Sequence, residues 1–381
     1  MPNIPTLLKP SPVITRVDFA SNLRGLAAVI VLLSHYCGVF WLNRAAVELL
    51  INAPILSVTI YPTPTILVFL HTLLFFDWGS YGVGIFFLIS GFVIPFSLSR
   101  ETAKTFLIRR FMRIFPLYSI GLTITLISVY VSGLYFSRLF PYIFTDLFVH
   151  YIIGFRDLFL SKNIDGIIWT LEIEFKFYIL CVLFIKLFKA KSAYVFIIPL
   201  VLFFISCITI YFSIFLCCSN SFTQYMYLFY LSSQYLIFMF IGVVYNYFYC
   251  NVIIKIRGFL LIGIFFILFY IHGYISVYKL SIDYMWGYFL SFVTFALCYR
   301  FHGRIRSFCF LSFLSDISYP LYVIHGVAGY VFISILLDYG VSIVYSLLIV
   351  TICVFVISWL LHKGVEIPAQ AIGRHLSQIS R

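Results

Sequence analysis

Long apolar stretches recur along the whole chain and limit the folds open to it. Ten of them are long enough, or nearly long enough, to cross a bilayer as a helix of about 20 residues. They lie at residues 24–42, 80–99, 114–136, 168–188, 193–216, 225–249, 257–276, 283–301, 318–337 and 341–362. The chain is 63% hydrophobic and 10% charged, whereas soluble domains are about 25% charged. We therefore predict an all-α integral membrane protein with about ten transmembrane helices, forming a single domain over residues 1–381.

The positive charges predict how these helices are oriented. A net charge of +12 would suggest a nucleic-acid partner in a soluble protein, but here it indicates the lysine and arginine excess of cytoplasmic loops. With a cytoplasmic N-terminus, nineteen such residues fall inside, among them Lys9, Arg16 and Arg381, and five fall outside. The outer five are Arg44, Arg138, Arg156, Lys162 and Lys279. Both termini are therefore expected in the cytoplasm, with the first span uncleaved as a signal anchor.

Ionisable residues inside the hydrocarbon region are costly, so each one is a candidate functional residue. The first span holds Arg24 and His35, eleven residues apart. That spacing is about 20° beyond three full helical turns, with a rise of about 16 Å. Both side chains therefore share one helix face, with Arg24 near the cytoplasm and His35 nearer the outside. The alternatives are that Arg24 is a snorkelling anchor and that His35 only packs in the core.

The fourth span holds two acids in the sequence IIWTLEIEFKFYIL. Glu174 lies about 10 Å below the outer boundary, a depth similar to that of His35, so we predict a buried His35–Glu174 pair. A carboxylate bound to one imidazole nitrogen would fix the tautomer and leave the other nitrogen as a base. Glu172 is the rival acid, but it stands four residues before Lys176, which favours a local helix ion pair.

A second histidine, His325, lies in the ninth span within the sequence ISYPLYVIHGV. Tyr319 and Tyr322 precede it by six and three residues, so the three side chains share a broad helix face. His325 is expected nearer the cytoplasmic end of its span, at a depth that does not match His35. It is therefore either a helper at a donor channel or a packing residue.

Three arginines gather between the second and third spans, in the sequence SRETAKTFLIRRFMRIFPLY. Arg109 and Arg110 lie four and three residues before Arg113, so a short helix before Pro116 would present all three together. Arginine contacts phosphate in a bidentate, geometrically fixed way. The cluster either binds a cytoplasmic ligand with several phosphates or contacts anionic lipid. Combined with the deep histidine, it suits an acyl-coenzyme A whose phosphorylated head stays in the cytoplasm while its thioester reaches into the membrane.

With these features the chain resembles the acyltransferase-3 family of bacterial membrane O-acyltransferases, which modify surface polysaccharides. The resemblance covers nearly the whole chain and rests on five stretches in order: LRGLAAVIVLLSHY, GVGIFFLISGFVI, FLIRRFMRIFPLY, WTLEIEFKFY and SYPLYVIH. It implies acyl transfer, with acetyl the expected group, from cytoplasmic acetyl-CoA to a sugar hydroxyl. The implied acceptor is a lipid-linked glycan, such as the O-antigen of lipopolysaccharide, across the bacterial inner membrane.

The resemblance also implies roles for individual residues. His35 would act as the general base or carry the acyl group itself, and Glu174, five residues after Trp169, would orient it. The donor would be held by Arg24, Arg110 and Arg113, with Arg109 beside them.

Other positions keep two interpretations. Ser90 and Gly91 either allow close helix approach or line the donor channel. Glu172 stands where the family often has a neutral residue. No esterase-like module is expected after the last span, because only about twenty residues follow it.

Two other functions compete with this one. A transporter or flippase of lipid-linked glycans would show interrupted half-helices and repeat symmetry, and neither is clear in the sequence. A receptor or scaffold would not need a buried histidine and acid at matching depth. The nine cysteines show no metal or disulfide spacing. We therefore predict a metal-free membrane O-acetyltransferase whose partners are acyl-CoA, a glycan acceptor and membrane lipids.

Overall fold

The computed structural model describes residues 17–65, 68–69, 77–215, 221–275, 280–306 and 308–379, and every regular element in these ranges is a helix. Lys9, Arg16, Lys279 and Arg381, which entered the charge count, lie outside the described residues. The helices are α1 (Asp18–Ser34), η1 (His35–Val39), α2 (Phe40–Leu42), α3 (Arg44–Ile51), α5 (Trp78–Leu98), α6 (Ala103–Tyr135), α7 (Phe144–Tyr151), α8 (Phe155–Leu158), α9 (Ile168–Leu183), α10 (Ile185–Lys189), η2 (Ala193–Phe196), α11 (Ile197–Phe215), α12 (Ser221–Tyr249), α13 (Lys255–Ile275), α14 (Ile282–Arg300), α15 (Cys309–Asp316), α16 (Ser318–Ile324), α17 (Val327–Asp338), α18 (Ile343–Leu361), η3 (His362–Glu366) and α19 (Ile367–Ile379).

The all-α membrane fold is confirmed. Seven helical segments of the described chain are long and apolar enough to cross a membrane, or eight if the bent pair α16–α17 counts as one span. Only helices and closed barrels satisfy their own backbone groups in lipid, so the apolar pattern places the elements well. Besides the bent pair, two predicted spans are not among these seven segments. The span at 168–188 corresponds to α9, which has only 16 residues, and the span at 283–301 corresponds to α14, which is less apolar than the seven. The count of ten spans and the side of the termini stay predictions.

The third predicted span needs a correction, because it belongs to a longer helix. α6 runs over 33 residues from Ala103 to Tyr135 and contains Pro116 in its interior. The three arginines therefore lie on the first turns of the same helix that crosses the bundle, and no separate short helix carries them. The last helix is also extended, because α18, η3 and α19 run without a break from Ile343 to Ile379.

Two other spans depart from regular α-helix near their histidines. α1 changes to a π-helical turn at His35 and then continues to Leu42. The ninth predicted span is interrupted between Ile324 and Val327, where α16 and α17 meet at a bend of 57°. The break was not evident in the sequence; it falls at His325 and at Gly326, whose ψ of −109° is not helical.

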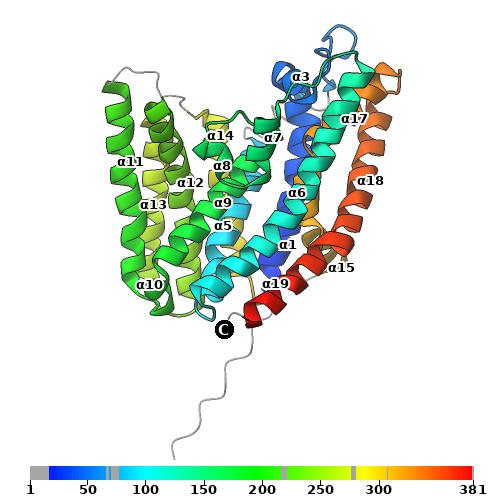
Figure 1. The fold of residues 1–381 in the computed structure, drawn as a ribbon. Helices are drawn as coiled ribbons and strands as arrows, with labels where there is room; N and C mark the ends of the chain where they lie inside the picture. Colours follow the sequence, from blue (N-terminus) through cyan, green and yellow to red (C-terminus); the bar gives the residue numbers. More distant parts are fainter. Residues whose placement is uncertain are drawn as a thin grey trace, which may run out of the picture.

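The helices form two groups joined by a central pair. In Figure 1, α11, α12 and α13 stand on one side, α1, α6, α17 and α18 on the other, and α5 and α9 lie between them. α5 packs closely on α12, because a Cβ atom added to Gly91 would come within 1.9 Å of the Met239 carbonyl oxygen. The close-packing interpretation therefore holds for Gly91.

Candidate active site

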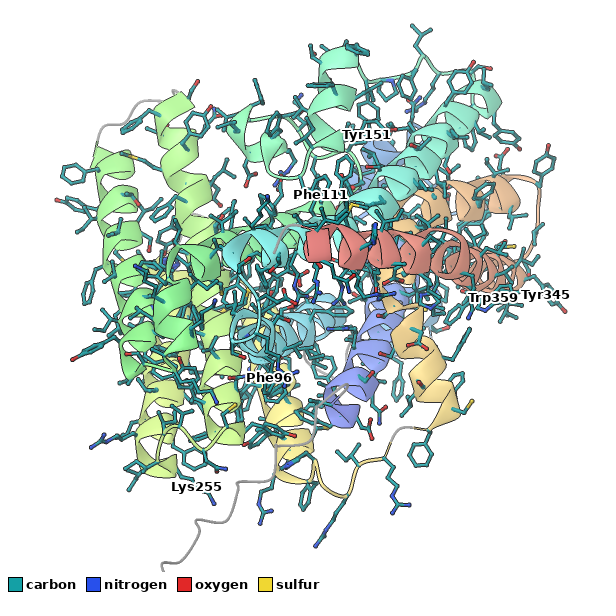
Figure 2. All side chains as sticks on the ribbon, turned by 60° about the horizontal axis from the view of Figure 1, so that its bottom comes forward. Phe96, Phe111, Tyr151, Lys255, Tyr345 and Trp359 are labelled. Atoms are coloured by element: carbon teal, nitrogen blue, oxygen red, sulfur yellow. The ribbon has the colours of Figure 1, made fainter. Side chains whose placement is uncertain are left out.

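A cavity of about 590 Å³, here called the vestibule, opens at the end of the bundle where α1 begins. The start of α1, the end of α5, the start of α6 and the η3–α19 segment surround it. Figure 2 brings this end forward, with Phe96 near the middle of the face and α19 running across it. Its lining includes Arg24, Phe96, Arg100, Glu101, Arg109, Arg113, Ser318, Tyr319, His362 and Glu366.

Two of the predicted donor arginines are already engaged within the protein. Arg109 lines the vestibule but forms an ion pair with Glu101 at 2.6 Å and donates a hydrogen bond to Ser377 Oγ at 2.8 Å. Arg110 is absent from the described lining and donates to Ser97 Oγ at 2.8 Å. Both side chains therefore hold α6 against its neighbours.

The other two arginines keep their donors available. Arg24 and Arg113 both line the vestibule, and neither forms a hydrogen bond or an ion pair with a residue of the described chain. The positive charges of Arg24 and Arg113 repel each other, and the negative charge of Glu174 attracts Arg24. A guanidinium presents five N–H donors in a fork that matches phosphate oxygens. This pair could hold an anionic group at the inner end of the vestibule.

A smaller cavity of about 80 Å³, here called the inner cavity, continues beyond these arginines. Arg24, Arg113, Ser318 and Tyr319 line both spaces. The inner cavity adds residues from α5, α9 and α16, namely Ser90, Thr170, Glu174, Tyr178 and Tyr322. The two cavities form a path from the end of the bundle toward its middle, lined first by arginines and acids and then by hydroxyl groups, Glu174 and apolar side chains.

Glu174 lies on this path. Its Oε1 atom accepts hydrogen bonds from Ser90 Oγ at 2.9 Å and from Tyr178 Oη at 2.5 Å. Both donors are side chains that line the inner cavity as well. Ser90 thus lines the inner cavity, whereas Gly91 beside it packs against α12; whether this cavity holds a donor stays a prediction.

The predicted direct pair of His35 with Glu174 does not form. His35 Nδ1 lies 2.6 Å from the hydroxyl of Tyr330, and the described hydrogen bonds of Glu174 go to other residues. Similar depth is not sufficient, because α9 packs against α5 and α12, and α5 packs between α9 and α1. The residue that holds His35 is thus a tyrosine of α17.

His325 was expected at a different depth from His35, and this prediction is wrong. The two imidazole rings lie 4.7 Å apart in an edge-to-face arrangement. Ser21 of α1 and Ser315 of α15 share a hydrogen bond of 2.8 Å, and His35 and His325 follow these serines by fourteen and ten residues. At 1.5 Å per residue the depths differ by only about one helical turn. The prediction took residue 318 as the cytoplasmic start of the span and so placed His325 near that side. It fails because α15, which precedes residue 318, already packs against α1 inside the bundle.

Glu172 also has a different partner from the predicted one. Its carboxylate forms an ion pair with Arg156 of α8, while Lys176 pairs with Asp157 at 2.5 Å and with Ser232 Oγ at 2.7 Å. Glu172 is 1% exposed, and Arg156 compensates its buried charge. Removing either partner would leave an unpaired buried charge and destabilise the fold. The two acids of α9 thus face different surroundings.

The remaining candidates divide between cavity and core. The hydroxyl of Tyr319 donates to the Ile114 carbonyl at 2.8 Å, and Tyr322 shares a hydrogen bond of 2.7 Å with Thr170; both tyrosines line the inner cavity. Trp169 packs its ring on Tyr235 at 5.3 Å and appears in neither described lining. Trp169 is therefore a packing residue.

Sequence reasoning missed several of these neighbours. Tyr178 stands four residues after Glu174, so helical spacing could have found it. Tyr330 follows His325 across the break at Gly326, and no helical period links the two positions.

Within the described ranges, no group of three or more histidine, cysteine, aspartate or glutamate side chains could hold a metal ion.

Comparison with known proteins identifies the family. A family described as an acyltransferase domain, of the acyltransferase-3 type, matches residues 17–363. Nodulation protein 10 of Rhizobium leguminosarum bv. viciae is 27% identical over 125 residues, a match that covers 28% of this chain and 34% of that protein. No solved structure matches. Because the family model matches most of the chain, the chain belongs to the acyltransferase-3 family of membrane acyltransferases.

Proposed function

We propose that this protein transfers an acetyl group from cytoplasmic acetyl-CoA to a sugar hydroxyl of a lipid-linked surface glycan, such as O-antigen, across the bacterial inner membrane. One observation carries the proposal beyond family membership. The vestibule ends at two arginines without described partners, and the inner cavity continues from them into the bundle. A path of this form suits a donor with an anionic head and a narrow arm.

In this proposal Arg24 and Arg113 bind the diphosphate of the donor, and the inner cavity holds the arm. Tyr322 lines that cavity, and its ring lies 5.7 Å from the ring of His325. His325 in turn lies 4.7 Å from His35. His325 is thus one ring contact beyond the inner cavity and His35 two, and the thioester at the tip of the arm would have to reach this pair.

His35 is the proposed general base. It takes the proton of the acceptor hydroxyl as that oxygen attacks the thioester carbonyl. The C–O bond of the new ester forms, the C–S bond breaks, and the leaving thiolate recovers the proton from the imidazolium. When Nδ1–H of His35 donates to the Tyr330 oxygen, Nε2 keeps the lone pair that the step needs. Glu174 acts away from the imidazole, balancing the charge of the two arginines.

The test is acyl transfer in membrane vesicles that receive radiolabelled acetyl-CoA and lipid-linked polysaccharide. Wild type, His35→Ala and Arg113→Ala are compared at matched expression. We expect label in the glycan with wild type, none with His35→Ala, and a higher acetyl-CoA requirement with Arg113→Ala. Normal transfer by His35→Ala would refute the base assignment. A wild type that moves glycan across the membrane without labelling it would favour the flippase.

A further inference from the structure

A third cavity, here called the side cavity, lies beside the vestibule and has no role in the path to His35. It measures about 250 Å³ and is formed by the end of α5, the turn after α10 and the end of α12. Its described lining includes Phe96, Arg100, Phe188, Lys191 and Tyr249.

The side cavity adjoins the vestibule. Phe96 and Arg100 line both spaces. The ring of Phe96 stands 5.7 Å from the ring of Tyr249 at an interplanar angle of 90°. The two rings therefore meet edge to face where the side cavity borders the vestibule. A ligand whose diphosphate lay in the vestibule could therefore extend one end past Phe96.

The lining combines positive charge with aromatic surface. Arg100 and Lys191 are exposed, and the described residues around this cavity include no acid. Lys191 also holds a left-handed backbone with φ of +48°, a conformation that is unfavourable for lysine and readily adopted by glycine. Two cations beside aromatic faces suit a planar base that carries a phosphate.

We propose that the side cavity binds the phosphorylated nucleoside end of the acyl donor, with the purine against Tyr249 and Phe96 and the ribose phosphate at Lys191 and Arg100. The inference rests on the proposed donor, acetyl-CoA, and adds the part of that donor which the catalytic path does not reach. It separates two binding regions: Arg24 and Arg113 for the diphosphate, and the side cavity for the nucleoside phosphate.

The test uses purified protein in detergent with two variants and one control. Lys191→Gln removes the charge, and Lys191→Gly removes it at a position whose backbone suits glycine, so loss of folding cannot explain its effect. Lys189→Gln is the matched control, because Lys189 is an exposed lysine outside the described lining. The probes are adenosine 3′,5′-bisphosphate, measured by equilibrium binding, and two donors, acetyl-CoA and S-acetyl-phosphopantetheine, measured by transfer.

We expect both Lys191 variants to weaken bisphosphate binding and to raise the KM for acetyl-CoA by about tenfold, as for one charged hydrogen bond. The KM for S-acetyl-phosphopantetheine, which lacks the nucleoside, should stay unchanged, and Lys189→Gln should match wild type. Two results would overturn the side-cavity assignment and leave the proposed function standing, provided that wild type transfers from acetyl-CoA. One is that the Lys191 variants change the KM for both donors equally, and the other is that they bind the bisphosphate as tightly as wild type. If wild type neither transfers from acetyl-CoA nor binds bisphosphate, both fail.

Discussion

Two histidines, one in each half of the bundle, both lie within apolar spans of the sequence and have different surroundings in the structure. His272 of α13 is fully buried; its ring stacks on Tyr230 at 3.8 Å, and its Nε2 lies 2.7 Å from Ser206 Oγ. His35 of the other half is partly exposed and meets the hydroxyl of Tyr330.

The difference lies in what surrounds each imidazole. His272 is held by α11, α12 and α13, appears in no described cavity lining, and has a buried Nδ1 without a described partner. His35 begins a π-helical turn and faces the break between α16 and α17, a few ring contacts from a cavity lined by arginines. The two histidines thus differ in backbone, because irregular helix surrounds His35 and regular helix surrounds His272.

The largest expected effect separates the two histidines directly. Replacing His35 with phenylalanine keeps a ring of similar size and removes the base, so we expect the transfer rate to fall by about 10²- to 10⁴-fold. The rate is measured per folded protein, with folding checked by gel filtration and thermal unfolding. A variant that keeps more than a tenth of the wild-type rate would place His35 in the same structural class as His272.

The second effect compares two arginines on one helix. Arg113→Gln removes a guanidinium without described partners, and we expect the KM for acetyl-CoA to rise about ten- to a hundredfold, as for a lost charged hydrogen bond. Arg110→Gln removes a side chain bound to Ser97, so we expect lower thermal stability with little change in KM. Equal changes in KM for the two variants would show that both bind the donor, as the family resemblance implies.

The third effect compares two tyrosines that lie near each other. Tyr330→Phe removes the hydroxyl at His35 Nδ1, and we expect kcat to fall about tenfold, the value of one hydrogen bond, with an unchanged KM and a shifted pH profile. Tyr36→Phe is the control, because the Tyr36 hydroxyl is buried without a described partner. A similar loss of kcat in both variants would mean that the tyrosines act only through packing.

Much of this layout could be predicted from the sequence. Apolar length located most of the helices, because it follows from local composition; the prediction that Arg24 and His35 share one helix face stays a prediction, since a π-helical turn begins at His35. Contacts between helices could not be predicted in the same way. Matching depth predicts a Glu174–His35 pair, yet which helices touch depends on packing, and the close approach at Gly91 joins α5 to α12. Likewise, the break at Gly326 brings Tyr330 toward His35 and interrupts the helical period.

The smallest expected effect is at His272. In His272→Phe the new ring can keep the stack on Tyr230, and Ser206 still donates to the Phe203 carbonyl at 2.9 Å. Because no buried donor is left without a partner, and the unpartnered Nδ1 is removed, we expect the free energy of unfolding to change by less than about 1.5 kcal/mol and kcat to stay the same within the error of the assay. Rates and thermal unfolding of this variant are measured beside those of His35→Phe. A large loss of kcat with intact folding would show that α11–α13 contribute to the reaction, so that the two halves of the bundle would share the catalytic role that we propose for His35.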